Sequence, residues 1–268
     1  MNVPRRFKQK SWVNQKGGSG KSILSYNDAF YLAELGKRVL YLDGDEQGNG
    51  SKRLVQYAVP GMVASDLFKD SPLAAIQPVE GQNLSVLMGD KGLIKAERTT
   101  MDDEEMVALV RAQIGRIAEH FDYVIVDTAG SNSRVANAFL VSSDYVAIPC
   151  RIDDYSIDVA KEVLKRIAFI QQQWNPHLVS LGILPNEFDA TQPAQTEWLK
   201  QLMTHFRKYL FGGLVKKSAA LKEAAAEGVP VWRLRDEKGQ IKTAARTSGK
   251  EVRAVFEMMM KAMEQANG

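Results

Sequence analysis

The residues best suited to do chemistry stand in one short segment, Gln15 to Ser22, which reads Q-K-G-G-S-G-K-S. Glycines allow a backbone to approach a ligand closely, and N–H groups at a helix start attract anions. A lysine and a hydroxyl placed directly after them can reach phosphate oxygens and Mg²⁺. The segment fits the phosphate-binding pattern G-x-x-x-x-G-K-[ST], except that Gln15 replaces its first glycine. We therefore expect a phosphate site that uses Lys21 and Ser22, rather than a solvated glycine-rich turn.

The elements on either side of this segment would aim its N–H groups at a phosphate. Ser11 to Val13 is typical of a short buried strand, and Ile23 to Leu35 of a helix. Gly36 then follows as a common residue for ending a helix. A strand, a glycine loop and a helix in this order predict a phosphate-binding loop.

Carboxylates follow two other apolar segments. Asp127 ends Tyr123 to Val126, the most apolar strand-like segment of the chain, so it would lie at the same sheet edge as the loop and hold Mg²⁺. Asp43 and Asp45, one residue apart, would share a face and orient a metal-bound or attacking water. The alternatives are a helix-capping role for Asp127 and a hydrated turn for the pair.

The pattern of the whole chain alternates strands with helices, which predicts a doubly wound, mostly parallel α/β sheet flanked by helices. Among its elements, Leu84 to Met88 is typical of a strand, Arg134 to Val141 and Ala219 to Glu227 of helices, and the polar segment Gly89 to Thr100 of a surface loop. Its 268 residues suit one domain, 1–268, with a short basic tail at 1–10. The single cysteine, Cys150, excludes an internal disulfide or a cysteine metal site. The sequence also has no apolar segment of membrane-spanning length and no secretory signal, which together favour the cytoplasm.

Basic residues gather toward the C-terminus. From Arg207 to Arg253 there are twelve basic and five acidic residues, a net +7 against +3 for the whole chain. Such a stretch is typical of binding to DNA phosphates without sequence preference, although it could also be an ordinary solvated surface. The candidate DNA contacts are Lys216, Lys217, Arg233, Arg235 and Arg246.

The last predicted helix, Val252 to Met263, repeats apolar residues at helical spacing. Such a helix can lie on a membrane surface or pack on the sheet. Its acidic and neutral end, from Glu264 to Gly268, lacks the lysines that a lipid surface favours, so we expect packing and no membrane partner.

With Lys16 included, the loop reads K-G-G-x-G-K-S and resembles the deviant Walker A motif of the ParA/MinD superfamily. The segments Val13–Gly18, Gly36–Leu40 and Leu42–Asn49 resemble its ParA branch, and the likeness extends from about Ser11 to the last helix. It implies a P-loop NTPase fold. The chain departs from the family at Ile23, Glu46 and Ala129, where a threonine, a proline and a proline are usual.

The resemblance implies a Mg²⁺-dependent ATP hydrolase in which Lys16 reaches the phosphates bound by the second subunit of a homodimer. Lys21 would contact phosphates in its own subunit, and Asp45 would position the attacking water. Metal contacts would come from Ser22, Asp43 and Asp127. The remaining nucleotide contacts would be Gly17, Gly18, Ser19, Gly20 and Ile23 around the phosphates and Asn186 at the adenine.

The same resemblance implies a role in plasmid or chromosome partition. ATP would drive dimerisation, the dimer would bind nucleoid DNA non-specifically, and a ParB-like centromere-binding protein would stimulate hydrolysis. Two alternatives stay open at this point. One is a related ATPase that positions another cargo or serves DNA transfer, and the other is a nucleotide-gated DNA-binding module with negligible hydrolysis.

Overall fold

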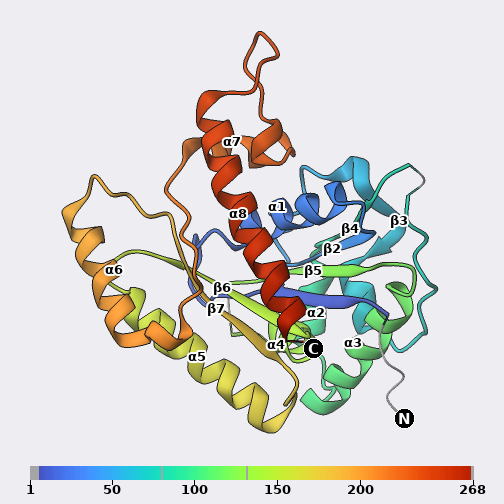
Figure 1. Ribbon diagram of the computed structural model, residues 1–268. Helices are drawn as coiled ribbons and strands as arrows, with labels where there is room; N and C mark the ends of the chain where they lie inside the picture. The colour runs from blue at the N-terminus through green and yellow to red at the C-terminus, as the bar shows by residue number, and fades with distance from the viewer. Residues whose placement is uncertain (1–5, 80, 131, 267–268) are drawn as a thin grey trace.

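The structure is a computed structural model that describes residues 6–79, 81–130 and 132–266. Within these residues seven strands form one sheet in the order β3-β4-β2-β5-β1-β6-β7 (Figure 1). Each neighbouring pair is parallel, so the doubly wound parallel sheet predicted from the sequence is confirmed. The strands are β1 (Lys8–Trp12), β2 (Val39–Gly44), β3 (Ala58–Val63), β4 (Leu84–Met88), β5 (Tyr123–Thr128), β6 (Tyr145–Arg151) and β7 (Val179–Asn186).

Helices cover both faces of this sheet (Figure 1). The first face carries α1 (Lys21–Glu34), α7 (Ala219–Glu227) and α8 (Thr243–Gln265). The second face carries α2 (Gly92–Glu97), α3 (Asp103–Ile117), α4 (Arg134–Val141), α5 (Ser156–Gln173) and α6 (Pro193–Phe206).

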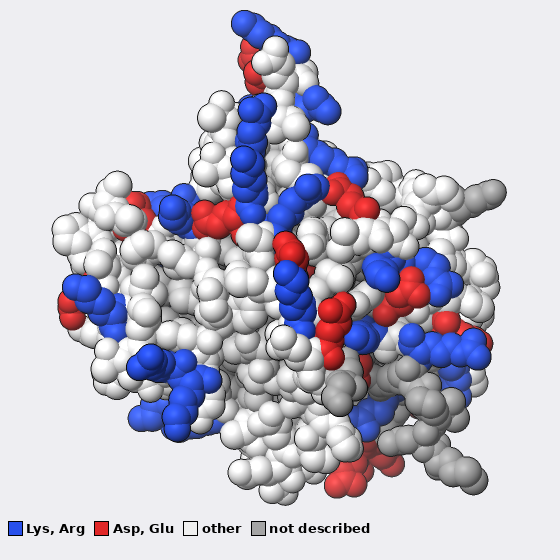
Figure 2. Space-filling model, in the orientation of Figure 1, with Lys and Arg blue, Asp and Glu red and all other residues white. Residues whose placement is uncertain are grey.

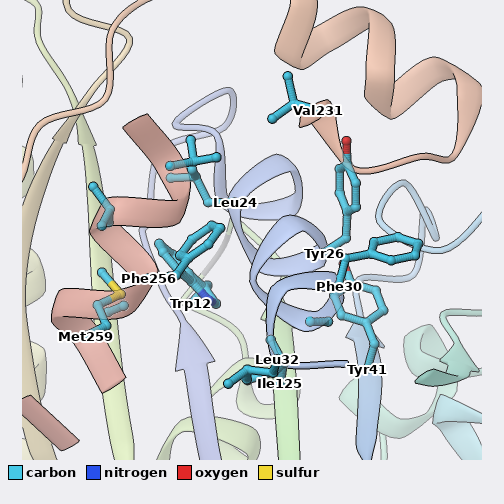
Figure 3. Packing of buried hydrophobic residues seen from close by; sticks show 14 of the residues in the cluster. Trp12, Leu24, Tyr26, Phe30, Leu32, Tyr41, Ile125, Val231, Phe256 and Met259 are labelled. Atoms are coloured by element: carbon cyan, nitrogen blue, oxygen red, sulfur yellow. The ribbon is translucent and has the colours of Figure 1, made fainter. Parts of the chain in front are cut away.

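The two helical layers are possible because side chains alternate along each buried strand. On β2, Val39 and Tyr41 face the core beneath α1 and α8, whereas Leu40 and Leu42 face the core beneath α3 and α4. Figure 3 shows the first core, in which Trp12 of β1 lies between α1 and Phe256 of α8. A strand with both faces buried reads as a continuous apolar run, which is why β5 was evident from the sequence.

The first strand begins at Lys8, three residues earlier than the sequence predicted, so residues 8–10 do not belong to a basic tail. Lys10 is fully buried, and its ammonium lies 2.7 Å from a carboxylate oxygen of Asp28 on α1. The indole Nε1 of Trp12 donates to the same carboxylate at 2.9 Å. These contacts satisfy a buried charge that would otherwise be costly, and they tie β1 to α1 on either side of the glycine loop.

Three elements escaped sequence-based prediction or were placed wrongly. The edge strand β3 contains Pro60 and Gly61, and α2 lies within 89–100, which the sequence predicted as loop. Helix α8 begins at Thr243 rather than at the predicted Val252. Its first turns were missed in the sequence because they are polar and include Gly249. A Cβ atom at Gly249 would lie 2.7 Å from the Trp232 Cβ, so this glycine permits close packing rather than ending the helix.

The apolar face of α8 packs in the core, as predicted. Val252, Val255 and Met259 are buried, and the Phe256 ring stands edge-on to that of Trp12 with centroids 6.2 Å apart. No helix among the described residues combines the length and the apolar character needed to cross a bilayer.

Candidate nucleotide-binding site

The glycine loop connects the end of β1 to the first residue of α1, Lys21. Gly18 and Gly20 adopt left-handed backbone conformations, with φ of 72° and 87°, which side chains with a Cβ rarely adopt. A Cβ atom at Gly20 would also lie 2.2 Å from Nδ2 of Asn186. Asn14 fixes the loop from below, since its Oδ1 accepts from the Lys16 N–H at 2.9 Å and its Nδ2 donates to the Pro149 carbonyl at 2.6 Å.

Lys21 lies at the centre of the loop and is only 7% exposed. Burial lowers the pKa of its ammonium, while the nearby carboxylates of Asp127 and Asp45 oppose that shift. Gly130 permits this arrangement, because a Cβ atom there would lie 3.3 Å from the Lys21 Nζ. The hydroxyl of Ser19 is buried beside Lys21 in the sequence and has no hydrogen-bond partner among the described residues. The loop therefore presents a buried cation and an unpaired donor.

Two aspartates meet at the carboxyl end of the sheet. Asp43 of β2 and Asp127 of β5 are direct register partners and are both fully buried. Burial, and then the charge of Asp43, raises the pKa of Asp127 to about 8. The hydroxyl of Tyr41 donates to Oδ2 of Asp127 at 3.3 Å, and the nearby Ser22 hydroxyl lowers the pKa of the same carboxyl. Its Oδ1 is buried with no partner among the described residues, which leaves one carboxylate oxygen for a ligand.

Asp43 is differently engaged, since both its oxygens accept hydrogen bonds. Oδ1 accepts from the Asp45 N–H at 3.1 Å, and Oδ2 accepts from the N–H and the hydroxyl of Ser51 at 2.8 and 2.7 Å. Burial raises the pKa of Asp43 to about 6, although these bonds act in the opposite direction. Asp43 thus holds the turn that carries Asp45, which is itself partly exposed toward the site.

These donors fit a divalent cation and a polyphosphate. Mg²⁺ takes oxygen ligands and usually one or two carboxylates together with waters and phosphate oxygens. Asp127, with its free Oδ1, and the Ser22 hydroxyl provide such a partial set beside the Lys21 ammonium. No group of three or more His, Cys, Asp or Glu residues able to hold a metal by themselves occurs among the described residues.

Lys16 does not join Lys21 inside the loop. Its Nζ lies 2.7 Å from Oδ2 of Asp153 and 4.9 Å from the centroid of the Tyr155 ring. Both partners follow β6, and the Tyr155 side chain is 58% exposed. The second lysine of the motif is therefore held at the protein surface by residues that sequence reasoning had not considered.

Asn186 lies beside the loop, and its Nδ2 donates to the Ser19 carbonyl at 2.8 Å. It lines a small cavity with Ile23 and Lys216 that has room for about one water, at roughly 10 Å³. Glu187 stands at this cavity in a left-handed conformation, φ 53°, and pairs with Lys222 at 3.5 Å. The predicted adenine residue is thus near the loop, but a purine needs this cavity to open.

The predicted DNA-binding residues divide into paired and unpaired charges. Arg233 lies 2.6 Å from Glu34 of α1, and Lys217 lies 3.5 Å from Asp189. Lys216, Arg235 and Arg246 are exposed, and no carboxylate among the described residues pairs with their side chains. Figure 2 shows basic side chains on the part of the molecule that projects above the sheet, with acidic side chains among them.

Several residues of the site were missed from the sequence alone. Tyr41, Gly50 and Ser51 surround the two buried aspartates, and a Cβ atom at Gly50 would lie 2.2 Å from the Tyr41 hydroxyl. A usable signal existed for Asp153 and Tyr155, because residues that follow β6 must reach the same sheet edge as the loop. No comparable signal marks Tyr41, which reads as one more apolar residue of a buried strand.

A parallel sheet that carries a glycine loop after the inner strand β1, with aspartates at the ends of β5 and β2 beside it, defines the class of P-loop ATPases. Residues 8–180 match the family model described as "AAA domain". The chain is 32% identical over 255 residues to Protein IncC from Escherichia coli, covering 94% of this chain and 68% of that protein. It is 27% identical over 222 residues to the sporulation initiation inhibitor protein Soj of Bacillus subtilis, covering 82% and 88%. The chain belongs to the ParA/MinD superfamily of partition ATPases and is an ATP hydrolase.

Solved structures with the same fold agree with this assignment. A variant of Cyanothece McdA in complex with ATP superimposes with a TM-score of 0.78 at 16% identity, covering 97% of this chain and 98% of that one. A plasmid partition protein from Borrelia burgdorferi bound to AMPPNP gives a TM-score of 0.73 at 19% identity, with coverage of 96% and 99%. At these identities the likeness concerns the fold.

Proposed function

We propose that this chain uses Mg²⁺·ATP to drive formation of a homodimer that binds DNA without sequence preference and takes part in plasmid or chromosome partition. Membership of the family makes the chain an ATP hydrolase, and the proposal adds a cycle of ATP binding, dimerisation, DNA binding and release. It is supported by the buried Lys21, by the free oxygen of Asp127 and by the exposed position of Lys16. Related structures solved with ATP, or with an ATP analogue and magnesium, support the choice of nucleotide and cation.

Residues on the loop divide the chemical work. Backbone N–H groups from Gly17 to Ile23 would bind phosphate oxygens, and Lys21 would offset their charge. Ser22 and Asp127 would hold Mg²⁺, which supplies charge neutralisation on the phosphates when bound. Asp45, on the turn that Asp43 fixes, would orient the attacking water. The hydrogen bonds from Ser51 keep that turn in place.

The observation that carries the dimer is the placement of Lys16. Its ammonium is bound to Asp153 at the surface, although it stands one residue from the glycine cradle. A lysine whose only duty was to bind phosphate in its own subunit would be expected to turn inward, where Lys21 already lies. A surface position on the Asp153 side suits contact with phosphates bound by a partner subunit, and ATP would then be enclosed between two subunits.

The proposal also includes DNA binding by the dimer and stimulation of hydrolysis by a partner protein. Exposed charges at Lys216, Arg235 and Arg246 would contact phosphates of nucleoid DNA, and two subunits held together would double the number of contacts. A ParB-like centromere-binding protein would stimulate hydrolysis and so release the dimer. Two relatives, the chromosome partitioning protein ParA of Myxococcus xanthus and the chromosome-partitioning ATPase Soj of Thermus thermophilus, support this choice of partner.

Lys16→Ala tests the dimer. We expect the variant to bind ATP with near-normal affinity but to lose ATP-dependent dimerisation and at least about 100-fold in turnover, since the partner's phosphates lose a cation in the transition state. Light scattering with a non-hydrolysable ATP analogue measures the dimer, and phosphate release measures turnover. Lys37→Ala, which removes an exposed lysine just beyond α1, is the matched control. A Lys16→Ala protein that dimerises and hydrolyses like the wild type would refute the proposal.

A further inference from the structure

A second pocket lies between α3, α4 and α5, away from the buried aspartates. Its volume is about 460 Å³, which is in the usual range for small-molecule sites. It opens because α4 has 8 residues, whereas the helices on either side of it have 15 and 18 and extend beyond it. Its apolar walls are Met106, Val107, Val141, Phe169, Ile170 and Trp174.

The charged residues of the pocket do not cancel. Asp103 pairs with Arg134 at 2.6 Å, and Glu162 pairs with Lys165 at 2.9 Å, so these four contribute no net charge. The fifth charged residue is Arg166 of α5, and no carboxylate among the described residues pairs with it. The pocket therefore carries one uncompensated positive charge.

Arg166 is held in place, but its charge is not satisfied. The residue is 9% exposed, and its Nε and Nη2 both donate to Oδ1 of Asn137, at 2.9 and 2.6 Å. Its Nη1 is buried and has no partner among the described residues. Burial lowers the pKa of the guanidinium to about 10. A buried cation without a counter-charge is costly, and an anion in the adjoining pocket would offset that cost without direct contact with Nη1, because the surroundings have a low dielectric constant.

Besides an anionic group, the pocket favours a flat apolar group in its ligand, because the aromatic ring of Phe169 lines it. The Phe169 side chain is 57% exposed and lines the pocket together with Trp174. Flat apolar groups pack well against such rings. Gln15 and Asn132 also line the pocket, so it borders the phosphate-binding loop.

We propose that this pocket binds a small organic carboxylate with a flat apolar body, with the anionic group beside Arg166 and the body against Phe169 and Trp174. The proposal does not depend on the dimer or on DNA binding. The volume accommodates a bicyclic aromatic acid, and the single excess charge favours one carboxylate rather than two.

The test compares two probes of almost equal shape, 2-naphthoate and its neutral analogue 2-naphthamide. Binding of each to the full-length chain is followed by ligand-observed NMR. We expect the wild type to prefer naphthoate by at least about tenfold, because the carboxylate is attracted by the nearby uncompensated charge of Arg166. Arg166→Met keeps an apolar stem but removes the charge, so it should abolish this preference while retaining the affinity for naphthamide.

A second variant is needed because Arg166 also joins α5 to α4 through Asn137, and its loss could unfold the protein. Phe169→Ala changes an exposed residue and should weaken both probes by about fivefold, as loss of an aromatic contact does. Met203→Ala on α6, 52% exposed and outside the pocket, should leave both affinities unchanged. Equal wild-type binding of the two probes, a preference that survives Arg166→Met, or unaltered binding to Phe169→Ala would overturn the proposal.

Discussion

The phosphate-binding loop and the basic C-terminal region both rely on positive charge, yet they hold it in opposite ways. Lys21 is buried, and its surroundings are set by glycines and by aspartates at the ends of two strands. Arg235 and Arg246 are exposed, and no carboxylate among the described residues pairs with their side chains. The buried Lys21 has a fixed position beside the expected phosphates, whereas each exposed arginine would contribute only part of the affinity for DNA.

The net charge counted along residues 207–253 does not equal the charge that this region presents on the protein surface. Of the basic residues between 207 and 253, Arg233 and Arg253 both pair with Glu34 of α1, which is distant in the sequence. Lys217 and Lys222 pair with Asp189 and Glu187, which also lie outside the counted stretch. A count along the sequence includes none of these acids, so a net charge of +7 overstates what DNA would meet.

The largest effect should follow from the buried charge. Lys21→Ala removes the buried lysine that follows the glycine loop and leaves Asp127 and Asp45 without the cation that lies near them. We expect ATP affinity to fall by at least about 100-fold and turnover to disappear, since phosphate charge would be unopposed. Binding of a fluorescent ATP analogue measures the first effect, and phosphate release the second.

The matched control for Lys21→Ala is Lys52→Ala, because Lys52 is exposed and its ammonium donates to Oδ1 of Asn49 at 3.3 Å. The control should bind and hydrolyse ATP normally. If Lys21→Ala also did so, the cradle would not be the nucleotide site, and the contrast between the two regions would fail at its stronger end.

A smaller effect should appear in the pH dependence of stability. The Asp127 pKa is about 8 in the folded protein, against about 3.9 in an unfolded chain. The folded state therefore retains a proton that the unfolded state releases, and stability falls as pH rises from about 4 to 8 in the absence of Mg²⁺. Asp127→Asn removes this titration. We expect the variant to be more stable than the wild type by on the order of 2 kcal/mol at pH 8, with no gain near pH 4.

Thermal unfolding with EDTA between pH 4 and 9 measures this difference. Asp122→Asn is the control of opposite sign, because hydrogen bonding with Arg38 lowers the pKa of that exposed carboxyl. Its contribution to stability is present above about pH 4 and is lost on acidification, so that variant should gain nothing at pH 8. Parallel profiles for Asp127→Asn and the wild type would mean that the aspartate is not buried in this way.

The sequence was sufficient for the features that depend on neighbouring residues. The glycine loop, β4, α4 and α7 were predicted correctly because each depends on a local pattern of glycines, apolar residues or helix ends. The position of Asp127 at the sheet edge that carries the glycine loop followed from the rule that carboxyl ends of parallel strands meet. These predictions needed no knowledge of distant contacts.

The remainder depended on contacts that no local pattern records. Lys10 looked like part of a charged tail because its partner, Asp28, becomes adjacent only when β1 packs on α1. The first turns of α8 were not predicted, because the close packing of Gly249 against Trp232 lies outside the helix itself. The position of Lys16 on Asp153 likewise required β6 to be placed beside β1.

The smallest expected effect separates the two kinds of basic residue. Arg246→Gln removes an exposed, unpaired charge, and Arg233→Gln removes one that already faces Glu34 at 2.6 Å. Each phosphate contact contributes about 0.9 to the slope of log affinity against log salt. We expect Arg246→Gln to reduce that slope by about this amount and to weaken binding severalfold on any sequence, whereas Arg233→Gln should change it by much less.

Fluorescence anisotropy with random duplexes, an ATP analogue and a series of salt concentrations measures both slopes. The comparison is sharp because both variants lose one positive charge and so alter the net charge of the protein equally. If affinity followed net charge alone, the two slopes would fall together, and the pairing of Arg233 with Glu34 would be irrelevant to DNA binding. If only Arg246→Gln lowers the slope, DNA binding depends on charges that no carboxylate of the folded protein neutralises. The basic C-terminal region would then resemble the phosphate-binding loop, because in both regions the contacts made on folding determine which cations can bind a phosphate.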